Sequence, residues 1–142
     1  MTLLDQVRCI PRVAHGDPRG CLIKLMTGLE PAGDRGIVEV YVVRSVPGAV
    51  RGNHYHVKTR EWFTLISGKA SLYLRDPAYE KTQILELDAD NPLTVEIPPG
   101  LAHALLATGA RDMWMIAATD RRYDSLDVVP FLLCSIEGKS KT

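Results

Sequence analysis

Two short stretches of this sequence carry three of its four histidines, at spacings that suit a metal ion. The first places His54 and His56 two residues apart and Glu61 five residues further on, and the second ends at His103. Side chains at positions i and i+2 of a β-strand point to the same face, so both imidazoles of the first stretch would point in one direction. Three imidazole nitrogens and one carboxylate oxygen suit a divalent ion, zinc above all, with iron, manganese and nickel as alternatives. We therefore expect His54, His56, Glu61 and His103 to be metal ligands.

The elements that must position these side chains are expected to be short strands. Runs of β-branched and aromatic residues recur between glycine, proline and aspartate, as is typical of an antiparallel sandwich or barrel. No long amphipathic helix is expected, only a short turn or helix near 78–81 or around Ser125. Gly68 lies between two such runs and predicts a hairpin. The expected strands cover residues 7–13, 20–27, 36–44, 49–56, 61–67, 70–75, 82–87, 93–97, 103–108 and 113–119.

Alternation along two of these strands assigns faces to charged residues. Glu61 shares a side with Phe63 and Leu65, so its carboxylate is expected to face the interior and to need a partner there. That partner is a metal ion or, alternatively, an arginine or lysine. Glu39 and Tyr41 share one side of another strand, where they either form the wall of a substrate cavity or face solvent.

The composition limits the classes of partner. A chain of 142 residues makes one domain, and 17 basic residues balance 17 acidic ones, which indicates neither nucleic acid nor an anionic membrane. The three cysteines are far apart and favour reduced thiols over disulfides. The N-terminal residues lack the pattern of a signal peptide, and no stretch has the length of a membrane span, so a cytoplasmic protein is expected. Residues 136–142 are expected to be flexible.

The two histidine stretches resemble the conserved motifs of the cupin superfamily. Motif 1, Gly-x5-His-x-His-x4-Glu-x6-Gly, is matched at every defined position, by Gly48, His54, His56, Glu61 and Gly68. The core of motif 2, Pro-x-Gly-x2-His, is matched by Pro98, Gly100 and His103, while its two ends differ, with Pro92 and Ala107 there. The resemblance implies an all-β fold, a single-domain double-stranded β-helix or jelly-roll barrel over 1–142, with its motifs at 48–68 and 97–107.

A narrower resemblance concerns cupins that modify sugars. The segments 17–20 and 44–55 are similar to segments of dTDP-4-dehydrorhamnose 3,5-epimerases, and 51–56 is similar to the cupin domains of capsular-polysaccharide enzymes. The segment 118–124 is similar to one in both groups and in sugar 3,4-ketoisomerases. This implies that the protein epimerises or isomerises a nucleotide-linked 4-keto-deoxysugar in polysaccharide or glycoside biosynthesis. Arg19 and Arg51 would bind the diphosphate, because guanidinium groups match phosphate oxygens.

The resemblance also implies catalytic roles, and one of them conflicts with the metal site. His54 would be the base that removes a proton next to the carbonyl, but an imidazole that binds a metal cannot also accept a proton. The metal-free epimerases have lysine at the position of Glu61 and glutamine at that of His56, and both differences favour a metal here. If His54 is a ligand, a metal-bound hydroxide or Glu39 is a candidate base; alternatively, the metal is structural. In the epimerases, a tyrosine that acts as the catalytic acid stands where this chain has two arginines. Tyr123 follows these arginines and is either that acid or a packing residue.

Other readings remain open. The same ligand set would serve an iron-dependent dioxygenase that acts on a small molecule, and a sugar- or ligand-binding cupin without activity is a third possibility. The alternative for Arg19 is an ordinary surface residue or an ion pair with Asp17. Related sugar cupins are commonly dimers, which implies a homodimer, and the apolar run Val128–Leu133 is the surface that a partner could cover.

Overall fold

The computed structural model describes residues 1–30 and 35–135, so the prediction for residues 136–142 lies outside the described residues. The described part is all-β, as predicted, with short strands and two single-turn 3-10 helices. No helix in it is both long enough and apolar enough to cross a membrane. The elements are η1 (Leu3–Gln6), β1 (Arg8–Pro11), β2 (Ala14–Asp17), β3 (Gly20–Ile23), β4 (Glu39–Ser45), β5 (Val50–His56), β6 (Glu61–Ser67), β7 (Lys69–Arg75), β8 (Thr82–Asp88), β9 (Leu93–Ile97), β10 (Ala102–Ala107), β11 (Met113–Thr119), η2 (Ser125–Asp127) and β12 (Val128–Pro130).

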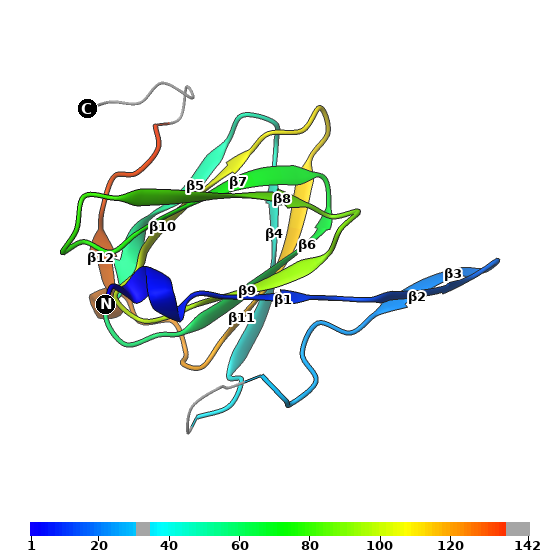
Figure 1. Cartoon of the computed structure of the whole chain (residues 1–142), viewed down its shortest axis with the longest axis horizontal. Helices are drawn as coiled ribbons and strands as arrows, with labels where there is room; N and C mark the ends of the chain where they lie inside the picture. Colours follow the sequence, from blue (N-terminus) through cyan, green and yellow to red (C-terminus); the bar gives the residue numbers. More distant parts are fainter. Residues whose placement is uncertain (31–34, 136–142) are drawn as a thin grey trace.

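Two five-stranded antiparallel sheets face each other and form the barrel (Figure 1). One has the order β1-β9-β6-β11-β4 and the other β12-β5-β10-β7-β8. Alternate residues of the strands point inward, and their aliphatic side chains fill the space between the sheets. This is the predicted jelly-roll barrel. The most deeply buried side chains include Leu72, Leu74, Val95, Leu101 and Met113.

The connection at Gly68 is a corner between the sheets. β6 and β7 are joined by this single residue, yet they belong to different sheets, so the predicted hairpin between them is wrong. Gly68 has a φ of 83°, and a Cβ there would lie 2.7 Å from the carbonyl oxygen of Asp112. Only glycine allows this close approach without strain. The true hairpin is formed by β7 and β8, which pair along their whole length.

The central strand β6 is buried on both faces. Glu61, Phe63 and Leu65 point into the barrel, as predicted, while Trp62 and Thr64 point outward and are also buried. On the outer side, the hydroxyl groups of Thr64 and Thr94 lie 2.8 Å apart. The segments before and after the β2–β3 hairpin contact Thr94 on this side, through Arg12 and the carbonyl of Leu25.

One buried ion pair joins the segment before the β2–β3 hairpin to the segment after it. Arg12 donates from Nε to Thr94 Oγ1 over 2.9 Å, and its Nη2 lies 3.2 Å from Glu30 Oε2. Glu30 also accepts hydrogen bonds from the backbone N–H and the hydroxyl of Thr27. Burial raises the pKa of Glu30, but these bonds and the charge of Arg12 outweigh it and lower the pKa to about 2.

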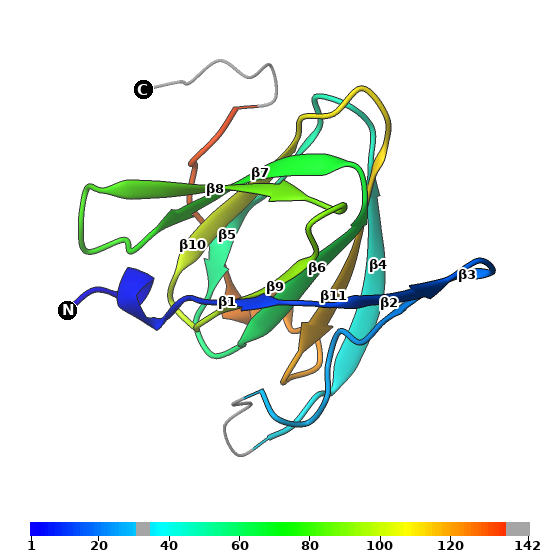
Figure 2. The ribbon, with the colours of Figure 1, turned by 45° about the vertical axis from the view of Figure 1, so that its right-hand side comes forward.

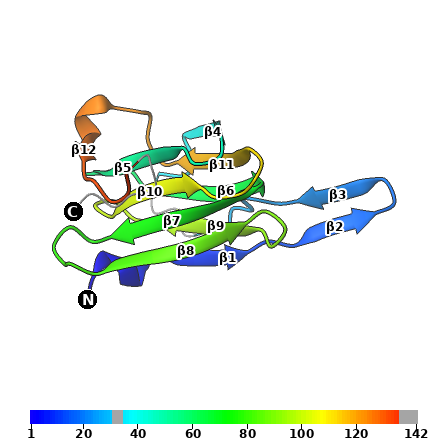
Figure 3. The same ribbon diagram turned by 90° about the horizontal axis from the view of Figure 1, so that it is seen from above.

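The hairpin of β2 and β3 forms an arm that projects from the barrel (Figures 1, 2 and 3). The two strands pair only with each other. β2 was not predicted, and β3 is shorter than the predicted strand over residues 20–27. At the tip of the arm, Nη2 of Arg19 lies 2.6 Å from Oδ2 of Asp17, and 90% of the Arg19 side chain is exposed. This is the ion pair that was the alternative reading for Arg19.

The short strand β12 was also missed by the sequence analysis. It pairs with β5, with Val128 opposite His56 and Pro130 opposite His54. The helix η2, expected around Ser125, directly precedes it. Val128 and Val129 are half-buried by this pairing, so part of the apolar run expected to face a partner is used within the chain.

Candidate functional site

Neighbouring strands bring the three predicted histidines together inside the barrel. His54 and His56 lie on β5, and His103 lies on β10 directly opposite His54. One ring nitrogen from each imidazole lies within 4.8 Å of the others. His54 and His103 are far apart in the sequence and meet because β5 and β10 pair. The motif spacing alone does not show this pairing.

A bulge in β5 sets the direction of these side chains. The register with β10 passes from His54 to Gly52, which leaves Asn53 as the extra residue. Asn53 has a φ of 57°, and its side chain binds the backbone of Leu133 and Cys134. Such bulges turn side chains at active sites, and asparagine tolerates the left-handed backbone. A Cβ on Gly52 would lie only 2.8 Å from the carbonyl oxygen of His103.

Glu61 reaches the histidines from the opposite sheet. Its Oε1 lies 3.3 Å from Nε2 of His56 and 3.3 Å from Nε2 of His103. This oxygen is buried, and no described residue forms a hydrogen bond with it. Two atoms bound to one zinc ion at the usual lengths and a tetrahedral angle are about 3.3–3.5 Å apart. The two distances from Glu61 match this spacing, and among the described residues no lysine or arginine pairs with Glu61.

The protonation of the histidines follows from their surroundings. Burial, followed by the charges of His103 and His56, lowers the pKa of His54 to about 4. Burial also lowers the pKa of His103. Burial acts to lower the pKa of His56 as well, but the nearby carboxylates of Glu61 and Asp127 outweigh it and raise the pKa. His54 is therefore neutral near pH 7, which is the form that binds a metal or accepts a proton.

Asp127 is a site residue that the sequence analysis missed. Its Oδ2 lies 3.4 Å from Nδ1 of His56, on the side of the ring away from Glu61. Asp127 is itself held by the hydroxyl of Thr59 at 2.5 Å and the backbone N–H of Lys58 at 2.7 Å. A carboxylate in this position fixes the orientation of a ligating imidazole. No motif marks Asp127, because the pairing of β12 with β5 brings it there.

Glu39 and Tyr41 line the cavity, which decides between the two faces left open for them. The hydroxyl of Tyr41 donates to Oε2 of Glu61 over 3.2 Å. Burial, the charge and hydrogen bond of Glu61 and the charge of Glu39 raise the pKa of Tyr41, so its hydroxyl stays protonated. Glu39 accepts a hydrogen bond of 3.1 Å from the backbone N–H of Tyr123. Their part in substrate binding stays a prediction.

Two adjoining cavities contain the predicted site. The histidine cavity, of about 230 Å³, is lined by the three histidines, Glu61 and Arg51. The middle cavity, of about 660 Å³, is lined by Glu39, Tyr41 and Tyr123 together with His56. Tyr123 lies on the wall of both although 71% of it is exposed.

The structure separates the two predicted diphosphate ligands. Arg51 borders the histidine cavity, with Nε donating to Ser45 Oγ over 2.9 Å and Nη2 donating to the carbonyl of Arg44 over 3.1 Å. Arg19 lines neither the histidine cavity nor the middle cavity, because it lies in the arm. Within one chain the structure therefore does not bring Arg19 to the histidines.

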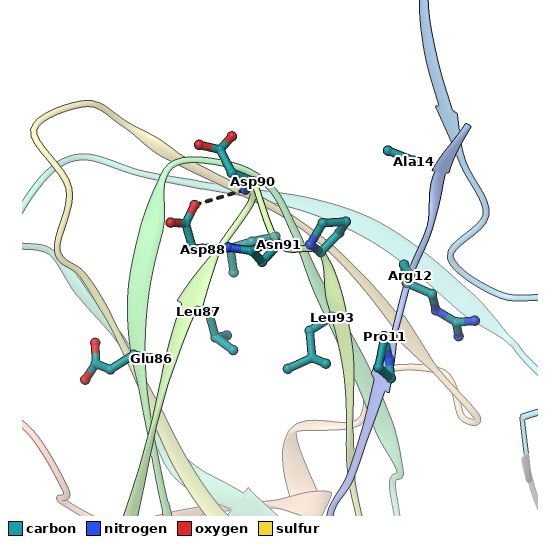
Figure 4. Close-up of a pocket in the computed structure, with 11 residues that line it drawn as sticks. Pro11, Arg12, Ala14, Glu86, Leu87, Asp88, Asp90, Asn91 and Leu93 are labelled. Atoms are coloured by element: carbon teal, nitrogen blue, oxygen red, sulfur yellow. Dashed lines mark hydrogen bonds between the residues drawn. The ribbon is translucent and has the colours of Figure 1, made fainter. Parts of the chain in front are cut away.

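Another cavity, of about 570 Å³, lies near the opposite end of β6, where Leu65 borders it (Figure 4). Leu87 and Leu93 form its apolar wall, and Asp88 at the end of β8 and Asp90 in the turn before β9 lie at its edge. It contains no histidine. Its polar groups are mostly carboxylates, and the oxygen of Asp88 already accepts the backbone N–H of Asp90. The histidine cavity is therefore the better candidate for a reactive site.

Residues 15–128 match the family model described as polysaccharide biosynthesis C-terminal domain. The chain belongs to this family. A characterised relative of this family member is the spore coat polysaccharide biosynthesis protein SpsL of Bacillus subtilis, which is 25% identical over 131 residues, covering 86% of this chain and 83% of the relative.

Solved structures similar to this family member confirm the predicted cupin fold. The capsular polysaccharide assembling protein CapF from Staphylococcus aureus is 27% identical, with a TM-score of 0.66 over 87% of this chain. The chain spans only 35% of that protein's length. The 3,5-epimerase RmlC from Legionella pneumophila (19% identity, TM-score 0.79) matches 89% of this chain and 72% of its own. The 3,4-ketoisomerase QdtA from Thermoanaerobacterium thermosaccharolyticum (22%, 0.73) matches 87% and 86%.

Proposed function

We propose that this protein epimerises or isomerises a nucleotide-linked 4-keto-deoxysugar in polysaccharide or glycoside biosynthesis. The observation that carries the proposal is a pair of adjoining cavities in a member of a polysaccharide biosynthesis family. One is lined by the three histidines and Glu61, and the other by Glu39 and Tyr123. SpsL and CapF are named for polysaccharide biosynthesis and assembly, and RmlC and QdtA for epimerisation and ketoisomerisation of sugars. A carboxylate and a phenol are suitable groups for moving the proton next to a carbonyl.

We further propose that the cavity binds a divalent metal ion, zinc above all. His54, His56, Glu61 and His103 would hold it, and the buried, unpartnered Oε1 of Glu61 supports this assignment. A bound ion would polarise the carbonyl of the sugar as a Lewis acid. With His54 bound in this way, Glu39 is the group on the cavity wall that can take the proton, and Tyr123 is the group that can donate one.

The test follows proton exchange at the carbon atoms next to the carbonyl. The protein is incubated with a dTDP- or UDP-4-keto-sugar in heavy water, and deuterium is located by NMR. We expect incorporation at C3 or C5, reduced at least 10-fold by Glu39→Gln or Tyr123→Phe and unchanged by Tyr79→Phe, which alters a half-exposed tyrosine away from both cavities. The proposal is refuted if the wild-type protein incorporates no deuterium with either substrate.

His54→Asn separates the two roles of His54. Metal analysis of protein purified without added metal is compared between the wild type and this variant. Loss of both metal and exchange identifies a ligand. Retained metal with lost exchange identifies the base.

The same four donor groups also suit an iron-dependent dioxygenase that acts on a small molecule. Oxygen uptake after addition of an iron(II) salt would favour that function. A sugar-binding protein without activity would instead bind a nucleotide-sugar saturably and form no product with any metal.

We propose that the protein is a homodimer. Val40, Val42, Ile66 and Trp114 are 40–64% exposed and lie on the neighbouring strands β4, β6 and β11. The arm of β2 and β3 projects from the barrel, and an isolated two-stranded hairpin has little stability of its own. An apolar sheet face of this kind is unusual in a monomer. Sedimentation velocity should show a dimer that Val42→Lys weakens, and a monomer at all concentrations contradicts the proposal.

A further inference from the structure

A third cavity adjoins the middle cavity and is bordered by four cationic side chains. It has a volume of about 350 Å³, and its cations are Arg35, Lys58, Arg121 and Arg122. We infer that this basic cavity holds the diphosphate of the substrate, which rests on the proposed function. It lies beyond the residues that the sequence motifs single out for phosphate binding, Arg19 and Arg51.

The three cavities form a row. The histidine cavity and the middle cavity share Tyr41, His56, Glu61 and Tyr123 as lining residues. The middle cavity and the basic cavity share Val38, Thr59, Arg121 and Asp124. His54 and His103 therefore lie at one end of the row and the cations at the other. A nucleotide-linked 4-keto-sugar could lie along this row, because its diphosphate is attached to one end of the sugar ring and its carbonyl lies towards the other end.

The cationic side chains of the basic cavity lack carboxylate partners in the described part of the chain. Among residues 1–30 and 35–135, none of its four cationic side chains forms an ion pair with a carboxylate. Of the two acids that border the cavity, Asp127 is occupied by Thr59, the N–H of Lys58 and His56. The other, Asp124, accepts the N–H of Leu126 with Oδ1. An excess of positive charge thus faces the cavity.

Arg121 provides the strongest sign of a missing anion. Its Nε is buried and has no hydrogen-bond partner among the residues that the structure describes. An unsatisfied buried donor is costly, and in a cationic group the cost is larger. Arg121 also borders both the middle and the basic cavity, so a phosphate at their junction would accept this N–H. A guanidinium group matches phosphate oxygens in pairs, and the neighbouring cations would add to the attraction.

Arg51 is a weaker candidate for the same task. It borders the histidine cavity at the other end of the row, and two of its N–H groups already bind Ser45 and the carbonyl of Arg44. It would orient the sugar end of the substrate. Ligands that contain a diphosphate but no keto-sugar distinguish the two arginines. Their binding should depend on Arg121 if the basic cavity holds the diphosphate, and on Arg51 if the histidine cavity holds it.

The experiment measures binding of inorganic pyrophosphate, dTDP and UDP by isothermal titration calorimetry. We expect Arg121→Gln to weaken the binding of all three about 10- to 100-fold. Lys58 and Arg122 are exposed, so the double variant Lys58→Gln/Arg122→Gln tests the cavity without disturbing the core and should weaken binding at least 10-fold. Arg111→Gln, at an exposed arginine outside the cavity, is the matched control and should bind like the wild type.

The outcomes separate this inference from the proposed function. Wild-type binding in Arg121→Gln and in the double variant, with loss in Arg51→Gln, overturns the basic cavity and leaves the proposed function intact. Binding that requires the basic cavity, without deuterium incorporation from either keto-sugar, supports the anion site and refutes the proposed function. Failure of the wild-type protein to bind pyrophosphate and both nucleotides overturns the inference.

Discussion

Replacing Gly52 with alanine should damage the histidine site through the backbone alone. Gly52 has a φ of 90°, and the added Cβ would lie 2.8 Å from the carbonyl oxygen of His103 and 3.2 Å from Cα of Ala104. Both atoms belong to β10, so relief of the contact requires that β10 moves away from β5. His103 and His54 lie opposite each other on these strands, and the displacement would separate them.

The expected loss of stability has two parts. A left-handed backbone costs an alanine about 1–2 kcal/mol. Forcing a strand to shift costs about 1–3 kcal/mol more, which gives a total of about 2–5 kcal/mol. Gly48→Ala is the matched control, because Gly48 has a φ of 84° and nothing lies within 4 Å of its Cβ position. It should cost only the first part.

The assay combines thermal unfolding with binding of a divalent metal in competition with a chelator. Gly52→Ala should lower the Tm by roughly 6–15 °C and Gly48→Ala by roughly 3–6 °C, and only the former should weaken metal binding. Gly68→Ala places the same kind of contact against Asp112, so it should lower the Tm like Gly52→Ala but spare the metal affinity. Equal Tm values for Gly52→Ala and Gly48→Ala would refute the reasoning.

Three further predictions concern polar groups. Glu30→Gln should lower the free energy of unfolding by up to about 3 kcal/mol at neutral pH. The pKa of Glu30 is about 2 in the folded protein against an ordinary 4.5. Urea unfolding should therefore show the full difference in stability between the wild type and the variant above pH 4.5, and a smaller difference as the pH falls towards 2. A difference that does not change with pH would contradict this prediction. Tyr41→Phe removes the hydrogen bond to Glu61 and should weaken metal binding about 10-fold in chelator competition, whereas Tyr79→Phe should not. Asn53→Gly keeps the positive φ but loses three hydrogen bonds to the segment after β12, and should lower the urea-derived free energy of unfolding by about 2–3 kcal/mol; an unchanged value would show that these bonds contribute nothing.

Local patterns were sufficient to predict the fold class and the grouping of the four candidate ligands. Alternation has a period of two along any strand, so Glu61 could be placed on the inner face with Phe63 before its neighbours were known. The interval between His54 and His56 works in the same way. His103 was placed by motif resemblance, and the structure supplies the reason, which is that β10 pairs with β5.

Features that depend on distant partners were not predictable. A single glycine between two strands fits a hairpin and a corner equally well, and the choice at Gly68 depends on which sheet each strand joins. Asp127 lies beside His56 only because β12 pairs with β5. The partner of Arg12, Glu30, belongs to an irregular segment without periodicity. Arg121 and Arg122 are neighbours in the sequence, but their common cavity with Arg35 depends on the folded chain.

The origin of the four donor groups in different sheets has a consequence for folding. His54, His56 and His103 come from one sheet, whereas Glu61 comes from the other. A ligand that binds all four is a cross-link across the barrel, and at 100 times its Kd it would add about 2.7 kcal/mol to the free energy of unfolding. The carboxylate meets the imidazoles only after both sheets have packed, so a partly folded chain has three histidines without their acid. Full-affinity binding is thus a property of the completed barrel, and the ligand would stabilise the packing of the two sheets against each other.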